Sequence, residues 1–318
     1  MTGKEVIDLG LKNIYRSFFE YRKGKKPSID LDNFQYNLEH ELFALWQDLN
    51  IDSYKHRGYR KFTICDNKKR EISVASVRDR VVHRLVYDYL TEIYDKIFIY
   101  DAWSCRKNKG LVGAIERTQI FMKQYSDGFI WRADISKFFD GVDHDVLLEI
   151  LKLRITNKKI ISLLKEIITS FNTKEGKGMP IGNLTSQIFS NIYLNEFDRY
   201  IKHSLKCKAY VRYGDDFVIF DKSKENLVYI REKAVCFLTD KIKLIMHAKN
   251  DFIITTKQGL KFLGVQMFPK GRKLSKRNSG RIIRKLELKN VASYSGIIRK
   301  HSNEQAIKKF QWMLISDL

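Results

Sequence analysis

The spacing of hydrophobic residues predicts helices over much of the chain. In several stretches apolar side chains recur every three to four positions, which places them on one face of a helix. A basic run containing Gly24 and Pro27 separates the first two stretches and is predicted to be a solvated loop. The predicted helices are residues 4–22, 31–49, 78–94, 110–125, 144–154, 158–171, 184–204 and 226–239.

Shorter alternating or β-branched runs predict strands. Residues 61–74 contain two such runs joined by a polar Asp66-Asn67 turn, which is typical of a β-hairpin. Another apolar run, residues 129–135, ends at Asp134, and the runs 210–211 and 217–220 flank a tight turn. Further short strands are predicted at 244–246, 252–254 and 261–265, followed by a basic helical region.

Two adjacent carboxylates occupy the tight turn Tyr213-Gly214-Asp215-Asp216. Such a pair is poorly solvated unless a cation lies against it, so a metal site competes with a plain polar turn. Asp134 supplies a third carboxylate at the end of another strand. If the two strands are neighbours in one antiparallel sheet, these side chains converge to a site for nucleotidyl transfer, in which two Mg²⁺ ions lie about 4 Å apart.

Composition and charge favour a polyanionic partner. The 318 residues are 44% hydrophobic, which is enough for a substantial core. Lys and Arg number 59 against 37 Asp and Glu, and the resulting charge of +22 favours RNA or DNA as the partner. Residues 270–300 contain eleven Lys or Arg and one acid, Glu287, as expected of a subdomain lying on a phosphate backbone. On charge alone, a ribosome-associated protein or a merely solvated basic surface stays open.

Other classes of protein are disfavoured. The four cysteines are far apart and form no Cys-x-x-Cys pair, so neither a zinc site nor a disulfide is expected. No apolar run approaches the length that crosses a bilayer, and the N-terminus has no signal-peptide core. We therefore expect no membrane partner and a cytoplasmic location.

The motifs from about residue 62 to residue 264 resemble those of reverse transcriptases. Asp134 matches the family's first metal-binding aspartate, and Asp215 and Asp216 match the aspartate pair of its Tyr-x-Asp-Asp box. The resemblance implies an α+β right-hand polymerase fold with an antiparallel sheet in the palm. It further implies N-terminal helices and fingers at 1–128, a palm at 129–268 with a finger-side insertion at about 146–180, and a basic helical thumb at 269–318.

The same resemblance implies roles for individual residues. The three aspartates, with the backbone carbonyl of Ile135, would hold two Mg²⁺ ions, for which Mn²⁺ could substitute. Phe139 matches the aromatic residue that lies under the sugar and excludes a 2′-hydroxyl, which makes dNTPs the substrate; an ordinary core phenylalanine is the alternative. Phe138 would face the opposite side of an extended strand, so at most one of the two is the gate.

The remaining matched positions concern the nucleotide and the primer. Lys249 matches a candidate general acid for the pyrophosphate, and a solvated lysine is the alternative. The other positions are Lys68, Lys69 and Arg70 for the triphosphate, Ile181 and Gly182 for the dNTP, and Phe262, Leu263 and Gly264 for the primer grip.

Residues 178–187 depart from the group II intron enzymes of this family. Ile181 stands where those enzymes usually have glutamine, and Gln187 where they usually have proline. The form Ile-Gly-Asn-Leu-Thr-Ser-Gln instead resembles reverse transcriptases of diversity-generating retroelements. That subgroup implies error-prone copying of a template-repeat RNA into mutagenised cDNA. The absence of a hydrogen-bonding amide beside the nucleotide agrees with low fidelity.

The implied partners are a template RNA, a cDNA primer strand, dNTPs and a basic, oligomeric accessory variability protein. Two alternatives stay open. The chain could be a retron, CRISPR-associated or antiphage-defence reverse transcriptase, or a catalytically inactive RNA-binding protein that kept the fold. Retention of all three aspartates argues against inactivity.

Overall fold

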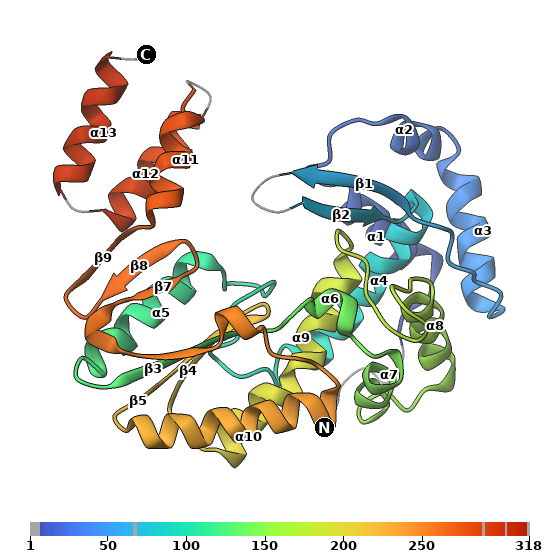
Figure 1. Ribbon diagram of the computed structural model, residues 1–318. Coiled ribbons are helices and arrows are strands. Elements are labelled where there is room, and N and C mark those ends of the chain that lie inside the picture. Colours follow the sequence, from blue (N-terminus) through green and yellow to red (C-terminus); the bar gives the residue numbers. More distant parts are fainter. Residues whose placement is uncertain (1–6, 66–68, 288–289, 303, 317–318) are drawn as a thin grey trace. The chain divides into compact units, whose positions relative to one another are not determined.

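A computed structural model describes residues 7–65, 69–287, 290–302 and 304–316 (Figure 1). The chain divides into two compact units, each assembled from three separate segments. Unit 1 comprises Met1–Ile99, Ile135–Tyr200 and Val235–Met246, and unit 2 comprises Tyr100–Asp134, Ile201–Ala234 and His247–Leu318. The division into fingers, palm and thumb stays a prediction.

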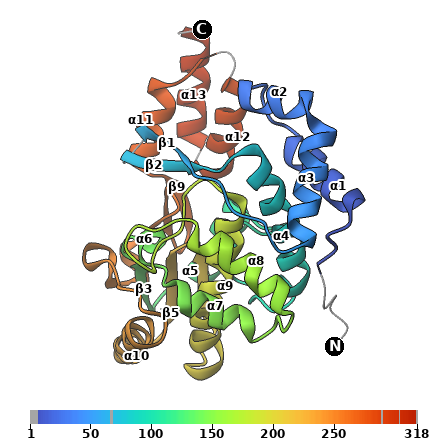
Figure 2. The ribbon, with the colours of Figure 1, turned by 90° about the vertical axis from the view of Figure 1, so that its right-hand side faces the viewer.

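Unit 1 is built around the long helix α4 (Val77–Tyr94), which packs against α1 (Leu11–Arg22) and α9 (Leu184–Arg199) (Figure 2). The helix α4 begins at Ser76, whose hydroxyl accepts a hydrogen bond from the backbone N–H of Asp79 and so caps the first turn. The other helices of the unit are α2 (Ile29–Tyr36), α3 (Leu38–Asn50), α6 (Phe138–Gly141), α7 (His144–Lys152) and α8 (Lys158–Thr169).

The same unit contains an antiparallel hairpin of β1 (Arg60–Cys65) and β2 (Lys69–Val74). The loop that precedes α9 is attached to β2, because the backbone N–H of Ser73 donates to the carbonyl of Ile181 at 3.0 Å. Asn183 donates from Nδ2 to the carbonyl of Ser73 at 2.7 Å. Gly182, between them, has φ +112°, and a Cβ there would lie 2.7 Å from a methyl group of Ile72. The close approach of loop and strand therefore requires glycine at this position.

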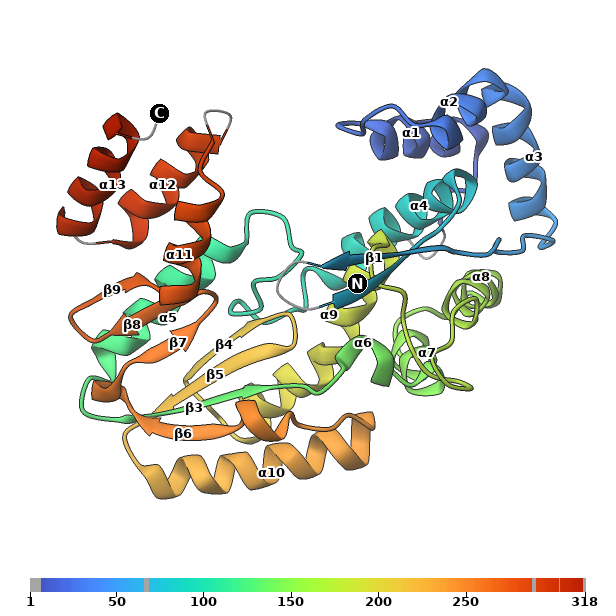
Figure 3. The same cartoon turned by 45° about the horizontal axis from the view of Figure 1, so that its top comes forward.

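Unit 2 contains a four-stranded antiparallel sheet in the order β4-β5-β3-β6, seen side by side in Figure 3. These strands are β4 (Ala209–Tyr213), β5 (Asp216–Asp221), β3 (Phe129–Asp134) and β6 (Phe252–Thr255). One face of the sheet packs against α5 (Leu111–Gln124) and a second sheet of β7 (Leu260–Phe262), β8 (Val265–Phe268) and β9 (Gly271–Leu274). The helix α10 (Lys224–Ile242) begins in unit 2 and ends in unit 1.

The C-terminal helices have a small core of their own. They are α11 (Lys276–Arg284), α12 (Val291–His301) and α13 (Glu304–Ser316). Ile282, Ile298 and Phe310 from the three helices pack with Leu274 at the end of β9. In the part of the chain that the structure describes, no helix is both long and apolar enough to cross a bilayer.

Most of the predicted elements are confirmed, including the paired strands of the hairpin at 61–74, the strand that ends at Asp134 and the helices at 78–94, 110–125 and 184–204. The predicted Asp66-Asn67 turn of the hairpin lies outside the described residues. The predicted helix 31–49 is wrong as one element, because the chain bends at Asn37 and forms α2 and α3. The predicted strand at 244–246 is also wrong, since Met246 makes only an isolated bridge to Ile135. The last segment is not purely helical, because β9 precedes its helices.

The chain leaves the extended conformation earlier than predicted after Asp134. Lys137 has φ +45°, and Phe138 and Phe139 lie in the short helix α6. The argument that these two side chains face opposite sides of a strand is therefore wrong, because they are not in a strand. Phe138 is nevertheless buried and Phe139 half-buried, so their surroundings still differ.

Candidate active site

The face of the sheet that packs on α5 is apolar at one end and carries charged side chains at the other. Its buried part joins the core formed by Ala114, Ile115, Phe121 and Met122 of α5. Because paired residues of neighbouring strands share a face, the rows across β4, β5 and β3 can be followed directly. They run from Ala209-Phe220-Ile130 through Val211-Val218-Arg132 to Tyr213-Asp216-Asp134. The face therefore ends in carboxylates.

Strand pairing brings the predicted carboxylates together. β3 and β5 are antiparallel neighbours, and Asp134 is paired directly with Asp216. Directly opposed residues have Cα atoms about 4.5–5.5 Å apart, so the two side chains are neighbours on the same face of the sheet. Asp215 precedes Asp216 in the turn. The predicted adjacency of the two strands is confirmed, whereas the metal-binding role of the three residues stays a prediction.

The turn that carries Asp215 is held from the opposite face of the sheet. Gly214 has φ +67°, a backbone conformation that glycine adopts at little cost. The guanidinium of Arg212, which is 1% exposed, donates to the carbonyl of Gly214 at 3.0 Å. The backbone of Arg212 also pairs with the segment of Asp101 and Trp103. The position of the turn is therefore fixed by buried contacts of the sheet.

Asp216 is paired with an arginine and has a shifted pKa. Arg132 reaches it with two nitrogens, Nε at 3.3 Å from Oδ1 and a terminal nitrogen at 3.0 Å from Oδ2. The pKa of Asp216 is raised to about 6. Burial is the largest cause, the guanidinium of Arg132 opposes it, and the charges of Asp134 and Asp215 add to it. The carboxyl group is therefore mostly ionised at neutral pH. Such a shift is typical of functional sites, although structural ion pairs also produce it.

Asp134 is oriented by the segment before β6. Asn250 donates from Nδ2 to Oδ2 of Asp134 at 3.0 Å. The next residue, Asp251, is itself fixed, because it accepts from the indole of Trp131 at 2.8 Å and from two nitrogens of Arg231. Lys249, the predicted general acid, is exposed, and it is the neighbouring Asn250 that contacts the carboxylate. The sequence analysis missed Asn250, which no charge or motif distinguishes.

The predicted nucleotide-binding residues are described within unit 1. Arg70 and Lys69 are exposed on β2, and Lys68 lies outside the described residues. Phe139 is half-buried, and its carbonyl accepts from the backbone N–H of Met179 at 2.7 Å. Ile181 and Gly182 lie in the loop attached to β2, with Ile181 half-buried and Gly182 exposed. Ile135, whose carbonyl was a predicted ligand, is 2% exposed.

The predicted primer grip forms a tight turn in unit 2. Phe262 is 1% exposed and pairs with Val265, which leaves Leu263 and Gly264 as a two-residue turn. Both turn residues have positive φ, as in the turns that suit the twist of a hairpin. Asn278 of α11 donates to the carbonyl of Gly264 at 3.0 Å, and a Cβ on Gly264 would lie 2.2 Å from that Nδ2 atom. The turn is thus packed tightly against α11.

Unit 1 contains a basic cavity of about 270 Å³. The end of α1 with the residues after it, α4 and the start of α9 line this cavity. Two of its cations, Lys23 and Lys25, come from the run that the sequence analysis assigned to a solvated loop. Arg80 and Arg84 of α4 complete the group, with Glu20 as the acidic residue of the lining. Such a concentration of cations suits a phosphate group.

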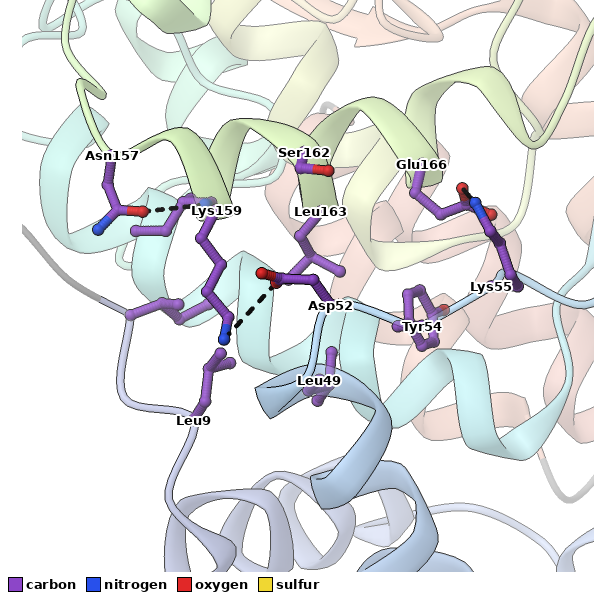
Figure 4. Close-up of a pocket in the computed structure, with 12 residues that line it drawn as sticks. Leu9, Leu49, Asp52, Tyr54, Lys55, Asn157, Lys159, Ser162, Leu163 and Glu166 are labelled. Atoms are coloured by element: carbon purple, nitrogen blue, oxygen red, sulfur yellow. Dashed lines mark hydrogen bonds and ion pairs between the residues drawn. The ribbon is translucent and has the colours of Figure 1, made fainter.

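A second cavity, drawn in Figure 4, is lined by lysines and acidic residues that form ion pairs with one another. Lys55 pairs with Glu166 at 3.0 Å, and Lys159 with Asp52 at 3.6 Å. Asn157 caps the start of α8 by accepting from the backbone N–H of Ile160. These charges are engaged in holding helices and leave no arrangement that suits catalysis.

Carboxylate oxygens are the ligands that Mg²⁺ prefers, so the donor chemistry of Asp134, Asp215 and Asp216 fits a divalent ion. Within the described ranges, no three His, Cys, Asp or Glu side chains are already arranged to hold a metal ion. In the structure the carboxylate of Asp216 forms an ion pair with the guanidinium of Arg132, at 3.0 Å.

An antiparallel sheet with opposed carboxylates at the ends of two neighbouring strands is consistent with the right-hand polymerase fold. Residues 56–267 match the family described as reverse transcriptase (RNA-dependent DNA polymerase), and the chain belongs to this family. Enzymes of this family generally use divalent metal ions. Membership also supports RNA-directed DNA polymerase activity for this chain.

Individual relatives agree with this assignment. The chain is 25% identical to protein YkfC of Escherichia coli, over 77% of this chain and 76% of that protein. It is 23% identical to the group II intron-encoded protein LtrA of Lactococcus lactis, over 71% of this chain but only 49% of LtrA. It is 28% identical to a putative COX1/OXI3 intron 2 protein of Saccharomyces cerevisiae, of which the match covers 20%. The chain thus spans about half of LtrA and a smaller part of the yeast protein.

Solved structures show the same fold. A telomerase from Candida tropicalis superposes with a TM-score of 0.51 at 13% identity, covering 68% of this chain and 55% of that one. A telomerase from Candida albicans, in complex with a fragment of telomeric RNA, gives a TM-score of 0.50 over 83% of this chain. At this level of identity the likeness concerns the fold alone.

Proposed function

We propose that this chain is an error-prone RNA-directed DNA polymerase of a diversity-generating retroelement, which copies a template-repeat RNA into mutagenised cDNA from dNTPs. The observation that carries the polymerase assignment is the pairing of Asp134 with Asp216, with Asp215 beside it in a turn fixed by Arg212. The assignment to the subgroup is supported by the sequence of the loop that contains Ile181.

The catalytic roles follow from the chemistry of the site. Asp134 and Asp215, with Asp216, would hold two Mg²⁺ ions, which would make the primer 3′-hydroxyl a better nucleophile and stabilise the pyrophosphate oxygens. Asn250 keeps one oxygen of Asp134 in a fixed direction. Arg70 is placed on an exposed strand where its guanidinium can bind phosphate oxygens in pairs. The primer and template backbones would meet the strongly basic surface of the chain.

The loop before α9 supports low fidelity. The backbone of this loop is hydrogen-bonded to β2 at Ser73, which fixes the position of Ile181 relative to that strand. The side chain of Ile181 is half-buried. An aliphatic side chain there makes no hydrogen bond with the incoming nucleotide or its partner. A net hydrogen bond contributes about 1 kcal/mol, so its absence lowers discrimination between correct and incorrect bases several-fold.

We expect Ile181→Gln to raise fidelity about several-fold, because it restores a polar contact that only a correctly placed base pair satisfies. The measurement is sequencing of cDNA made by purified protein on a defined RNA. Ile245→Gln makes the same change at a residue that is 69% exposed, and serves as the control. An unchanged misincorporation spectrum in Ile181→Gln, compared with the control, would contradict the proposal.

The general activity is tested by extension of an annealed DNA primer on RNA with Mg²⁺ and dNTPs. Extension with frequent misincorporation supports the proposal. Accurate extension supports the second candidate, a polymerase like those of the intron-encoded relatives, which the match to LtrA favours. Absence of extension supports an inactive RNA-binding protein. A template repeat next to the gene separates the retroelement function from retron, CRISPR-associated and antiphage-defence roles.

The proposed accessory protein is basic, and α2 and α3 offer a surface that suits it. Residues 28–54 contain no Lys or Arg, although the whole chain has a net charge of +22. Tyr36 is 90% exposed and Phe43 is 47% exposed, so the same segment also presents aromatic rings to solvent. A surface of this kind repels phosphates and attracts a basic protein. Its acidic residues are Asp30, Asp32, Glu39, Glu41, Asp48 and Asp52, of which Asp30, Asp48 and Asp52 pair with Arg60, Arg78 and Lys159.

We expect the double variant Asp32→Lys with Glu39→Lys to weaken binding of the purified accessory protein at least about tenfold, since reversed charges disrupt complementarity. Both residues are exposed, so folding should be preserved. Glu149→Lys on α7, also exposed, is the control. Binding by the double variant as tight as by the control, measured by isothermal titration calorimetry, would place the accessory protein elsewhere.

A further inference from the structure

We infer that Asn250 and Asp251 are positioning residues, which together connect the carboxylate of Asp134 to helix α10. Arg231 of α10 holds Asp251, and the residue before Asp251 contacts the carboxylate. The inference rests on the proposed polymerase function and deepens it. It assigns a task to a turn and to a distant arginine, whereas the three aspartates keep their proposed role as metal ligands.

The turn before β6 holds Asp134 at two points. The backbone N–H of His247 donates to the carbonyl of Asp134 at 2.8 Å. Further along the same turn, Asn250 donates from Nδ2 to Oδ2 of Asp134 at 3.0 Å. The turn is closed on itself, because the backbone N–H of Asn250 donates to the carbonyl of His247 at 2.9 Å. One short segment therefore holds both the main chain and the side chain of Asp134.

Strand register explains why an amide reaches this carboxylate. The strands β3 and β6 are antiparallel, and their last pair is Arg132 with Phe252. Continued towards the turn, the same register sets Asn250 opposite Asp134. Because β3 lies between β5 and β6, Asp134 has Asp216 on one side and Asn250 on the other. The amide is therefore placed by the sheet, as the opposed carboxylate is.

Asp251 is held by two elements at once. Its Oδ1 accepts from the indole of Trp131 on β3 at 2.8 Å. Arg231 donates to both of its oxygens, from Nε at 2.8 Å and from a terminal nitrogen at 2.7 Å. The side chain of Asp251 is only 8% exposed, so the loss of Arg231 would leave a largely buried carboxylate without its cation. The turn would then shift to bring Asp251 towards water, and Asn250 would move with it.

A fixed direction matters for a carboxylate that binds ions. Two ions about 4 Å apart need their oxygen ligands in defined places, and a displacement of about 1 Å can lower a rate about a hundredfold. A donor on one oxygen of Asp134 restricts rotation of the carboxylate and leaves the other oxygen to an ion. Because the donor is a neutral amide, the negative charge that attracts the ion is retained.

The test uses two measurements on the full chain. The first is Mn²⁺ binding to the protein without nucleic acid, from electron paramagnetic resonance of the free ion. The second is primer extension on RNA with Mg²⁺, which gives kcat and the KM for dNTPs. The variants are Asn250→Ala, Arg231→Gln, Arg231→Lys and the double variant Asn250→Ala with Arg231→Gln.

Matched controls come from the same unit. Asn226→Ala also removes an amide donor from a carboxylate, since Asn226 donates to Asp221 at 2.8 Å. Lys257→Gln also removes one positive charge, from an exposed ion pair with Asp127. Both controls should keep Mn²⁺ binding and kcat within about twofold of the wild-type values, because exposed contacts contribute little.

In Asn250→Ala we expect Mn²⁺ to bind about three- to tenfold more weakly, because the freed carboxylate of Asp134 must be ordered when an ion binds. We expect kcat to fall at least about tenfold. The KM for dNTPs should change less than about twofold, since the orientation of Asp134 serves the reaction rather than the binding of the nucleotide.

The direction of the change in Arg231→Gln distinguishes positioning from charge. Loss of a positive charge by itself would tighten the binding of a cation. If Arg231 acts by holding the turn, Mn²⁺ should instead bind about two- to fivefold more weakly, and kcat should fall about three- to tenfold. Arg231→Lys keeps the charge without the two-nitrogen contact and should lie between Arg231→Gln and the wild type. Adding Arg231→Gln to Asn250→Ala should change kcat less than about twofold, because both variants interrupt one chain of contacts.

Three outcomes would overturn the inference. One is that Asn250→Ala alters neither Mn²⁺ binding nor kcat more than Asn226→Ala does. Another is that Arg231→Gln leaves Mn²⁺ binding unchanged or tightens it, as the loss of charge alone would. The third is that the effects of Asn250→Ala and Arg231→Gln on kcat multiply in the double variant.

Folding and the proposed function are judged separately. Thermal unfolding without metal ions shows whether each variant is folded. If Arg231→Gln fails to fold, Asn250→Ala and Arg231→Lys decide. If the wild-type protein extends no primer, the proposed function fails, and Mn²⁺ binding by the same variants still decides whether Asn250 positions Asp134.

Discussion

Primer extension should be abolished in Asp134→Asn. The amide removes one negative charge and one oxygen ligand from the edge where β3 meets β5. Stabilisation of the transition state by a metal ion contributes several kcal/mol, and each 1.4 kcal/mol changes the rate about tenfold, so the loss should be roughly a thousandfold or more. The measurement is single-turnover extension of a DNA primer on RNA.

A matched control separates catalysis from general effects of charge. Asp127 precedes the same strand and is exposed, where it pairs with Lys257 at 2.9 Å. Asp127→Asn should therefore extend primers within about twofold of the wild-type rate, since exposed ion pairs contribute little. Equal activity of the two variants would show that Asp134 holds no catalytic ion. Both proteins should show the same circular dichroism spectrum.

The second large effect is expected on the preference for dNTPs over rNTPs, which depends on the 2′ position of the nucleotide sugar. Phe139→Ala should allow incorporation of rNTPs, because it removes the ring that would contact a 2′-hydroxyl. A steric conflict of this size costs about 1–3 kcal/mol, so the preference for dNTPs over rNTPs should fall roughly ten- to hundredfold. The quantity to measure is the ratio of kcat/KM for dCTP and CTP on the same template.

Phe138 provides the control for this prediction. It is 3% exposed and packs edge-on against Phe139, at 5.4 Å between ring centres, and against Tyr193. Phe138→Leu should reduce stability but leave the preference between dCTP and CTP unchanged. If Phe138→Leu, rather than Phe139→Ala, relaxed that preference, the gate would be assigned to the wrong residue.

Much of the fold could be predicted because local patterns decide it. The helical spacing at 78–94 gives α4, and the alternating residues at 61–74 give the β1-β2 hairpin. The sequence pattern gave a wrong element where a short polar residue interrupts a helix or where tertiary contacts decide which segment joins the sheet. Asn37 interrupts a continuous helical pattern, and its side-chain amide donates to the backbone carbonyl of Asn33 at 3.4 Å. Residues 244–246 look like a strand, yet the sheet is extended by β6 instead.

The candidate site was predicted in part. The motif identified Asp134, Asp215 and Asp216, and the pairing of β3 with β5 brings the first and last of these together. No pattern in the sequence indicated Asn250, because a single amide after a lysine is not distinctive. The partner of Arg132 was equally hidden, since it depends on the register of two strands that are more than eighty residues apart.

The amino-acid sequence by itself predicted the family, a polyanionic partner and three candidate carboxylates, because these depend on residue types and their order along the chain. Only the tertiary structure decided how the carboxylates differ. Strand register set Arg132 against Asp216 and the turn before β6 set Asn250 against Asp134. Charge and hydrogen bonding act over a few ångströms in space, and the distance along the chain says nothing about which groups come that close.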